Sequence, residues 1–525
     1  MTLALPGTAE DTIPLRLERH RRSGAHPALL GAAVVVAALA LVPAGFVIWV
    51  LVQSGWQTAA SLLFRPRVGE ILLATLLLQA LAIPLCVGLA LLLAWLTERS
   101  DLPVRGVWRW LAVAPLAIPA FVMAYAWDST FPMLRGLWPA VGISVLAYFP
   151  LVYLPIIAQL RRLDPAVEDV AATLGYSPAR VFVLVVLPQL RLAILGGSLL
   201  IGLHLLAEYG LYVLIRYDTL TVAIVNQFQA VYDGPAANLM GIVLVACALG
   251  LLALESALRG NRRYARVGGG AARQAPVAGL GRSKVLWMLV PLTTALLAIG
   301  LPLVTLLRWM LIGGAEAWHV TELTAALGQS SFYAVAGAGL VTLAALPIAW
   351  LSARAPGPVQ RALESVHLQV GALPGVIVAL ALVAITVRVA LPLYQTAATV
   401  LLAYGLLFLP RAIVSVRASL AQVPVELQNG AAALGRSPFA AALGVTLRLA
   451  MPGIAAGMAL VAMGIVTELT ATLMLSPIGT ETLATQFWAR TGEFDHMGAA
   501  PFALAMVVLS IPLCIILHRQ ATGAR

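Results

Sequence analysis

Three ionisable side chains lie inside long apolar stretches of this chain, where lipid could not solvate their charge. Glu208 and Glu468 stand at equivalent places, 468 − 208 = 260 residues apart, and His204 lies one helical turn before Glu208. Two hypotheses stay open for the glutamates: they line a route that favours a cation or its complex, or they make hydrogen bonds between helices. For His204 the favoured interpretation is a packed histidine bonded to a neighbouring helix, with a place on that route as the alternative.

A duplicated loop is the second feature whose residue types and spacing indicate a function. The run LGYSP from Leu174 to Pro178 recurs as LGRSP from Leu434 to Pro438. Glycine permits the positive φ that ends a helix, and Ser-Pro starts the next helix. The loops 161–191 and 416–450 therefore each predict a short helix, a sharp turn and a helix that leads back toward the preceding elements. Two copies at matching positions argue against a mere connecting loop.

The composition identifies the surroundings of these residues as a lipid bilayer. Hydrophobic residues make up 61% of the 525 residues and charged residues only 10%, too few to cover the surface of a soluble protein. The net charge of +11 then records membrane topology rather than nucleic-acid binding. The cysteines Cys86, Cys247 and Cys514 all lie in apolar stretches, without the spacing of a metal site or a disulfide framework.

Apolar runs long enough to cross a bilayer, which takes about 20 residues, number twelve. They lie near 28–52, 71–96, 110–127, 138–159, 192–215, 236–258, 285–311, 331–352, 368–387, 395–415, 452–475 and 499–517. Prolines within these runs predict helix kinks, at Pro84, Pro115, Pro119, Pro347 and Pro374. The fold class is therefore an all-α polytopic membrane protein.

Basic residues predict the orientation of these spans. With the N-terminus inside, 26 of the 33 Lys and Arg residues, Arg411 among them, are assigned to cytoplasmic segments. The other seven fall outside, namely Arg65, Arg67, Arg135, Arg216, Arg308, Arg388 and Arg490. Both termini are therefore expected in the cytoplasm, in a multi-pass protein of the bacterial inner membrane.

The chain repeats internally with offsets of 255 to 260 residues. Besides the duplicated loop, AWLTER at 94–99 recurs as AWLSAR at 349–354, and Gly197 matches Gly457. The expected domains are a cytoplasmic tail at 1–27, a first half at 28–258, a flexible cytoplasmic linker at 259–284, a second half at 285–518 and a tail at 519–525. Six spans per half give a parallel repeat, which predicts a pseudo-two-fold axis along the membrane normal and a pathway between the halves.

The segment DVAATLG at 169–175, followed by Leu187-Pro188, resembles the EAA loop of binding-protein-dependent ABC permeases. NGAAALG at 429–435 resembles it too. The resemblance implies that the short helix of each loop docks on an ATPase subunit and transmits its closure. Asp169 and Asn429 replace the usual Glu, and Arg448 stands where the first copy has Pro188. The implied coupling residues are Asp169, Ala171, Ala172, Gly175, Ser177, Pro178, Pro188, Asn429, Ala431, Ala432, Gly435, Ser437 and Pro438.

The resemblance covers about 70–515 and implies the type I importer fold. Within the family, APLAIPA at 114–120, YDTLT at 217–221 and ELTATL at 468–473 look most like the fused iron(III)-type permeases. It implies a permease for a solute brought by a periplasmic binding protein, with ferric iron as the expected solute and two copies of an ABC ATPase as partners. The chain carries no phosphate-loop motif, so ATP-Mg is expected on the ATPase partners and no cofactor on this chain.

Other solutes and one other class stay open. Thiamine, a polyamine or an organophosphonate would suit the same architecture, because a separate binding protein makes most of the selection. An ion-coupled secondary transporter can also have twelve spans in two parallel repeats, and would use Glu208 and Glu468 for coupling. That class leaves the duplicated loops without a purpose. An enzyme is not expected, since neither a metal motif nor a catalytic cluster is evident.

Overall fold

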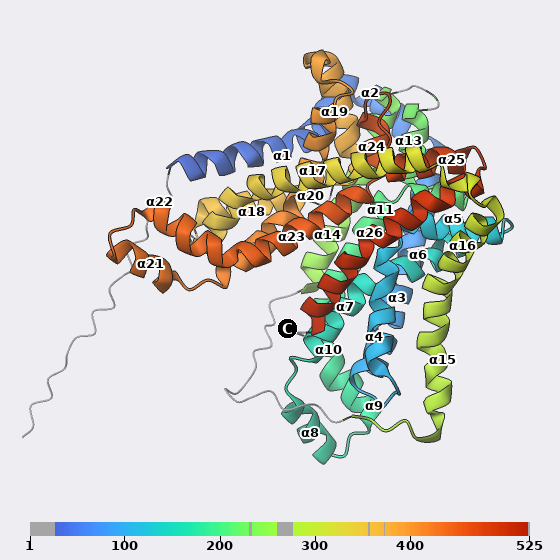
Figure 1. Ribbon diagram of the computed structural model, residues 1–525, viewed down its shortest axis with the longest axis vertical. Coiled ribbons are helices and arrows are strands. Elements are labelled where there is room, and N and C mark those ends of the chain that lie inside the picture. The colour runs from blue at the N-terminus through green and yellow to red at the C-terminus, as the bar shows by residue number, and fades with distance from the viewer. Residues whose placement is uncertain are drawn as a thin grey trace, which may run out of the picture.

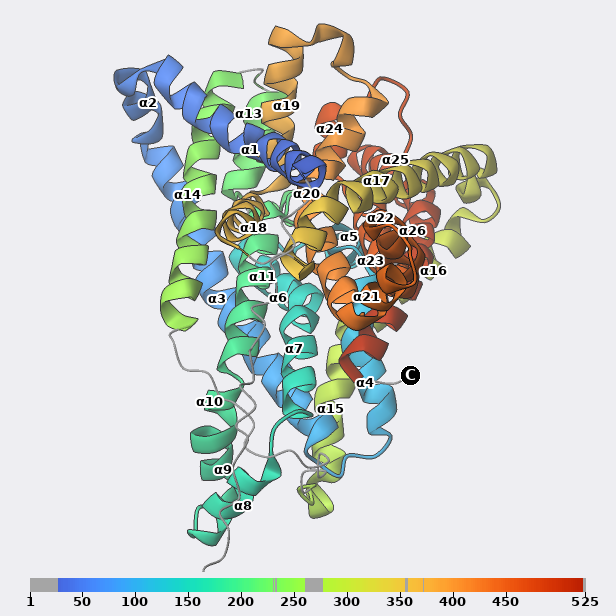
Figure 2. The same cartoon turned by 90° about the vertical axis from the view of Figure 1, so that its left-hand side faces the viewer.

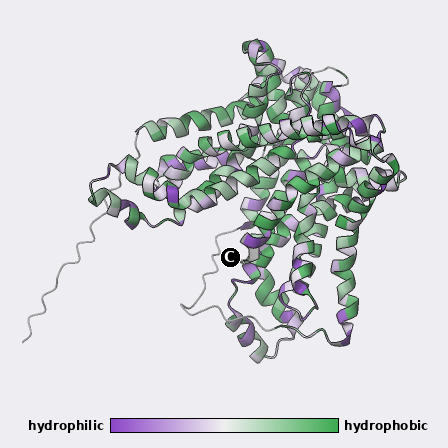
Figure 3. Ribbon diagram, viewed as in Figure 1, coloured by the Kyte–Doolittle hydropathy of each residue, from purple (hydrophilic) through white to green (hydrophobic). Residues whose placement is uncertain are grey.

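The computed structural model describes residues 27–522, except 230, 232–233, 260–276, 355–356 and 372. Within these residues the regular structure is helical, and the sole β contact is an isolated bridge between Ser100 and Ala278. The long helices are apolar along their length, whereas hydrophilic residues gather mainly at helix ends and in loops (Figure 3). The predicted all-α polytopic membrane class is confirmed.

Nine described segments are long and apolar enough to cross a membrane, and two bent helix pairs raise that number to eleven. In the first half these are α1 (Pro27–Ser54), α3 (Pro66–Glu98), α6 with α7 (Leu137–Leu160) and α14 (Gly234–Arg259). In the second half they are α15 with α16 (Gly281–Gly313), the segment Glu316–Arg354 that contains α17 (Val320–Arg354), α20 (Ala397–Ala421), the segment Pro438–Val466 and α26 (His496–Thr522, of which His496–Arg519 meets the test).

The remaining three predicted spans are interrupted or short. The run predicted at 110–127 bends by 92° between Arg105–Ala117 and α5 (Ala120–Thr130), and the run predicted at 192–215 follows a 60° bend before α11 (Arg191–Ala207). The run predicted at 368–387 forms the 15-residue helix α19 (Gly375–Val389), preceded by α18 (Pro358–Val370). Pro119 and Pro374 stand immediately before α5 and α19, because proline has no amide hydrogen to continue a helix.

The first span of each half packs against the other half. Helix α1 lies against α17, α18 and α19, and α15 with α16 lies against α3, α4 (Arg105–Val113), α5 and α6. The views in Figures 1 and 2 show this exchange, with α1 among second-half helices and α15 beside α3 and α4. The reciprocal arrangement is what a pseudo-two-fold relation between the halves requires.

Close packing inside each half depends on a matched pair of glycines. A Cβ at Gly197 would stand 2.6 Å from Val152, and one at Gly457 would stand 2.6 Å from Ser415. Both glycines lie on span five and face span four, in α11 and in α23 (Arg448–Val466). Small residues let membrane helices approach closely, so the repeated glycine reflects the same helix contact in both halves.

Aromatic rings join the halves at one end of the bundle. Phe121 and Tyr125 of α5 pack on Phe487 of α25 (Leu483–Gly492), with ring centroids 5.5 and 5.2 Å apart. The hydroxyl of Tyr125 also donates to the carbonyl of His496 in α26, at 2.6 Å. These contacts tie the bent helix of the first half to the second half.

The end of the linker between the halves is anchored to the first half. The amide of Ala278 donates to the Arg99 carbonyl at 2.8 Å, and the Asp101 amide donates to the Ala278 carbonyl at 3.1 Å. The Asp101 carboxylate accepts the Leu280 amide and pairs with Lys284, at 2.8 and 2.6 Å. Residues 277–284 are thus bonded to the first half, while 260–276 lies outside the described residues, and the flexible linker stays a prediction.

We predict that Asp101 holds this linker end in place. The hydrogen bond from Lys284 lowers the pKa of Asp101 below its ordinary 3.8. The contact is therefore stabilising above pH 3.8 and is lost only as the pH falls through the lowered value. Cysteines at positions 100 and 278, in a chain without native cysteines, should cross-link quickly at pH 7. Adding Asp101→Ala should slow cross-linking by about threefold, the scale of an exposed ion pair.

Asp164→Ala serves as the control, because Asp164 caps α8 (Pro165–Thr173) in another loop. It should leave the rate of cross-linking unchanged. Equal rates with and without the Asp101 carboxylate would show that backbone pairing alone anchors the linker.

Candidate functional site

A cluster of ionisable side chains spans the boundary between the halves. A guanidinium nitrogen of Arg411, on α20, lies 3.3 Å from Nε2 of His204, on α11. The other ring nitrogen of His204, Nδ1, lies 2.8 Å from the Leu200 carbonyl and so carries the proton, which leaves Nε2 to accept from Arg411. The ring also packs on Tyr148, with centroids 5.6 Å apart. His204 is thus a hydrogen-bonded histidine, and its partner belongs to the opposite half.

Glu208 and Glu468 occupy matching helix breaks. Oε1 of Glu208 accepts the Leu211 amide at 3.0 Å, and Oε1 of Glu468 accepts the Ala471 amide at 2.9 Å. Each carboxylate therefore caps the short helix that follows, α12 (Gly210–Leu214) or α24 (Thr470–Leu475). Inside an apolar region such caps satisfy amides that would otherwise have no partner.

The two glutamates differ in their second contact. Oε2 of Glu208 accepts the Tyr148 hydroxyl of α6, which is the hydrogen bond between helices that the second hypothesis expected. Glu468 has no such bond to a tyrosine among the described residues, and it attracts Arg411 electrostatically. The structure therefore brings His204, Glu208, Glu468 and Arg411 into one region between the halves, called the central cluster below.

Arg411 was wrongly placed by the topology prediction. It was counted with the cytoplasmic basic residues, yet it lies within α20, ten residues before the helix ends at Ala421 (421 − 411 = 10). Its side chain is exposed, and its guanidinium lies 5.3 Å from the centroid of the Phe408 ring. One signal could have found it, since Arg411 falls inside the predicted span 395–415 and directly follows Pro410.

Both duplicated loops have the predicted turn geometry. Helix α8 is followed by Gly175 with φ of 84° and then by α9 (Pro178–Val181). Helix α21 (Val425–Ala433) is followed by Gly435 with φ of 87° and then by α22 (Pro438–Ala441). Neither glycine has a neighbour that would obstruct a Cβ, so backbone conformation alone requires glycine.

The serines of the turns start the following helices. The Ser437 hydroxyl accepts the Ala440 amide at 3.2 Å, and the Ser177 hydroxyl accepts the Arg180 amide at 3.5 Å. The loops lie at the outer ends of two groups of helices, α8–α9 at the bottom of Figure 1 and α21–α22 at its left. The other predicted coupling residues lie on the two short helices, namely Asp169, Ala171 and Ala172 on α8 and Asn429, Ala431 and Ala432 on α21.

Large apolar side chains are exposed on both loops. Leu174 is 72% exposed and Leu434, its counterpart directly before the turn glycine, is 88% exposed. Val170 and Phe439 add to these surfaces, at 59% and 75%. Exposed apolar patches at the tips of loops are typical of surfaces that dock a partner protein.

The loops lead into the next span through a matched π-helical turn, over Phe182–Val186 and Ala442–Leu447. Beyond it the halves differ. Pro188 lies close to the 60° bend between Phe182–Gln189 and Arg191–Ala207, whereas the second half, with Arg448 in place of that proline, has one candidate span over Pro438–Val466. The departure from the family pattern at Arg448 thus coincides with a structural difference, although the second-half helix also contains a proline, Pro452.

An arginine at the end of span two anchors each loop. Arg99 donates to the Leu160 carbonyl at 3.4 Å, and Arg354 donates to the Leu420 carbonyl at 3.3 Å. Arg99 also pairs with Glu168 of α8 at 2.9 Å, where both side chains are largely buried, and Arg354 donates to the Val423 carbonyl at 2.9 Å. Each loop is therefore bonded to the end of α3 or of α17.

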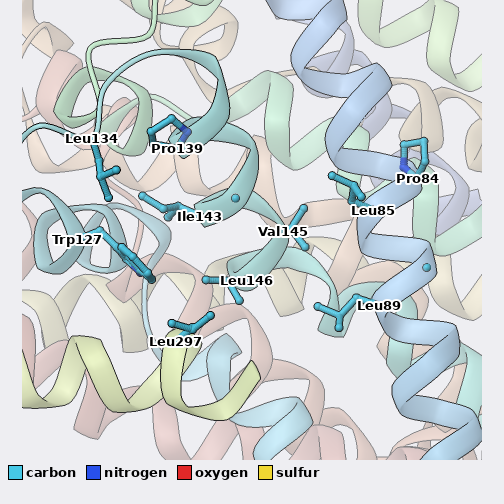
Figure 4. Close-up of a pocket in the computed structure, with 12 residues that line it drawn as sticks. Pro84, Leu85, Leu89, Trp127, Leu134, Pro139, Ile143, Val145, Leu146 and Leu297 are labelled. Carbon is cyan, nitrogen blue, oxygen red and sulfur yellow. The ribbon is translucent and has the colours of Figure 1, made fainter. Parts of the chain in front are cut away.

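A separate apolar pocket of about 610 Å³ lies between α3, α6 and the segment Leu296–Gly300. Figure 4 shows Leu85, Trp127 and Leu297 pointing toward this space. Its lining includes no ionisable side chain. It therefore offers no charge to an ionic solute and is distinct from the central cluster. Among the described residues, no group of three His, Cys, Asp or Glu side chains could hold a metal ion.

Comparison with known proteins agrees with the class that the fold defines, a polytopic membrane permease with two similar halves. The family described as "Binding-protein-dependent transport system inner membrane component" matches residues 345–522. The chain is 33% identical to the Fe(3+)-transport system permease protein FbpB 2 of Haemophilus influenzae, over 90% of this chain and 94% of that protein.

More distant relatives match parts of the chain. The sulfate transport system permease protein CysT of Escherichia coli is 28% identical over 41% of this chain and 86% of its own length. The putative 2-aminoethylphosphonate transport system permease protein PhnV of Salmonella typhimurium is 29% identical over 31% of this chain and 61% of its own length. The chain belongs to the binding-protein-dependent permease family. It is a multi-pass inner-membrane permease subunit of an ABC importer, a transport component rather than an enzyme.

The positive φ of Gly435 generates a test of the turn. Gly435→Ala should strain the turn by about 1–2 kcal/mol, because a Cβ disfavours the left-handed region. This energy shifts the balance of turn conformations by roughly 5- to 30-fold. ATP-dependent uptake and binding of the ATPase subunit should both fall in reconstituted vesicles. Gly435→Asn is the matched control, since asparagine tolerates this conformation, and it should retain most activity. Equal activity of the two variants would contradict a need for this geometry.

The buried Arg99–Glu168 pair generates a second test. Arg99→Ala leaves the Glu168 carboxylate, 15% exposed, without its cation, which typically costs about 3–5 kcal/mol for a buried pair. We expect α8 to become sensitive to protease and the purified permease to unfold at a lower temperature. Arg105→Ala removes an exposed arginine of the adjacent helix and should change neither measurement. Adding Glu168→Gln should recover part of the loss, and a lack of recovery would show that the pair does not anchor the loop.

Proposed function

We propose that this permease forms the pathway by which ferric iron, delivered by a periplasmic binding protein, enters the cell. The supporting observation is the extent of the match to the Fe(3+) permease, which covers 90% of this chain and so includes both halves. The sulfate and phosphonate permeases each match less than half of the chain. The fused two-half architecture is thus shared with the iron permease along nearly its whole length.

We propose two copies of a cytoplasmic ABC ATPase subunit as partners, one at each duplicated loop. Two docking surfaces of similar chemistry support this stoichiometry, with Leu174 on one and Leu434 on the other. ATP-Mg binds to these subunits in the proposal, and this chain binds no cofactor. Both termini and both loops lie on the cytoplasmic side, and the binding protein docks on the opposite side.

The proposed mechanism follows the contacts of the loops. Closure of the ATPase subunits moves α8 and α21, and the arginine anchors at Arg99 and Arg354 pass this motion to α3 and α17. The π-helical turns pass it to span five, which ends at Glu208 and Glu468. The central cluster lies between the halves, so their relative motion opens it to one side or to the other. Each step needs contacts that differ between the two states.

A small oxyanion such as sulfate or a phosphonate is the second candidate solute. Arg411 favours it, because a guanidinium in the pathway binds anionic oxygen atoms. Relatives named as sulfate and 2-aminoethylphosphonate permeases belong to the same family.

Reconstitution of the permease with its ATPase and binding protein tests the proposal. Vesicles should accumulate radioactive iron only when ATP and the iron-loaded binding protein are both present. Radioactive sulfate, offered with the same components, is the matched control and should remain outside. Sulfate uptake without iron uptake would favour the second candidate. Iron uptake by the permease alone, driven by an ion gradient, would instead indicate a secondary transporter.

A further inference from the structure

Arg411 is an exposed cation in the interior of a membrane span. It lies well inside the 25-residue helix α20, next to the buried residues Ala412 and Ile413. An arginine at such a depth faces water or a partner, because hydrocarbon does not solvate a guanidinium. Its contact with His204 of the opposite half places it at the boundary between the halves. Its exposed surface therefore faces the space between them and not the lipid.

Most hydrogen-bond donors of Arg411 are unused. A guanidinium has five N–H groups, and the one described hydrogen bond of Arg411 reaches Nε2 of His204. Arg411 forms no ion pair with an acidic residue that the structure describes. Its closest electrostatic partner is Glu468, which attracts it without a direct bond. Arg411 therefore has free N–H donors and a positive charge that are available to a solute.

The two glutamates have fewer free hydrogen-bonding groups than Arg411 has. Both oxygens of Glu208 accept hydrogen bonds, one from the Tyr148 hydroxyl and one from the Leu211 amide. One oxygen of Glu468 accepts the Ala471 amide. These bonds hold the carboxylates at the helix breaks, where they act as caps. The side chain with the most free hydrogen-bonding groups in the cluster is therefore the arginine.

A guanidinium selects a particular chemical class. Its planar donors fit carboxylate and phosphate oxygens in pairs, and its positive charge repels a bare metal cation. The first half has no arginine at the equivalent place, because its span four, Leu137–Leu160, contains none. An anion would therefore contact an arginine of the second half only, although the halves are otherwise similar.

We propose that Arg411, oriented by His204, is the point in the pathway that contacts the anionic part of the solute. This inference rests on the proposed function, and it means that ferric iron passes the central cluster with anionic oxygen ligands bound, not as a bare cation. The partner chemistry is an oxyanion or a carboxylate that coordinates iron. The cluster then recognises the ligand shell and not the metal.

The test follows iron and anion together. Proteoliposomes with the ATPase and the binding protein are supplied with radioactive iron plus labelled phosphate or labelled citrate. The wild-type permease should accumulate one of these anions with iron in a fixed ratio. Arg411→Gln should lower iron uptake at least tenfold, whereas Arg411→Lys keeps the charge and should lose less than half. ATPase stimulation by the loaded binding protein should persist in Arg411→Gln, which shows that the variant is folded and coupled.

Arg308→Gln is the matched control, because Arg308 lies on α16 beside Trp309, away from the central cluster, and the change should leave uptake unchanged. Iron uptake by Arg411→Gln at the wild-type rate would overturn the inference, as would iron uptake with neither anion, and the proposed function would stand. A wild-type permease that carries no iron but carries sulfate would overturn the proposed function. Loss of that sulfate uptake in Arg411→Gln would then preserve the anion contact.

Discussion

The hydrocarbon interior of a bilayer cannot solvate the end of a helix, and the centre of this permease is arranged around that constraint. Span five stops inside the apolar region in both halves, and a glutamate accepts an amide of the helix that resumes. Without these caps, at Glu208 and Glu468, the breaks would expose backbone donors at a cost of several kcal/mol each. The caps allow the chain to turn back within the membrane, and the turn brings ionisable groups to the boundary between the halves.

The helix contacts, loop anchors and turns repeat in both halves, whereas the central cluster does not. Glycines on span five, arginine anchors on span two, turn glycines and π-helical turns all recur. These parts must respond together if two identical ATPase subunits act on the two halves. The central cluster has a single arginine, and only Glu208 has a tyrosine partner. The similarity of the halves is therefore incomplete at the boundary between them.

Local patterns in the sequence predicted what local physics decides. The LGxSP runs predicted the turns, because a glycine at positive φ and a helix that starts at Ser-Pro depend on only a few neighbouring residues. Long apolar runs predicted nine spans directly, while the runs at 110–127 and 368–387, which contain prolines, form a bent pair and the short helix α19. The position of Arg411 could not be derived from a count of basic residues, which assumes that arginine avoids the membrane. The exchange of α1 and α15 between the halves depends on tertiary packing, and no periodicity encodes it.

The duplicated loops and the central cluster are joined by continuous elements. The loop helix is bonded to the end of span two through a buried ion pair in the first half and through carbonyl contacts in the second. Its following helix continues into span five, whose other end is the capped break. Span five therefore has a duplicated loop at one end and a central carboxylate at the other. In the first half the helix bends by 60° between Gln189 and Arg191, close to Pro188, whereas in the second half Pro438–Val466 forms one candidate span, with Pro452 inside it. The two halves therefore differ near the start of span five, although a glutamate caps the break at its other end in both.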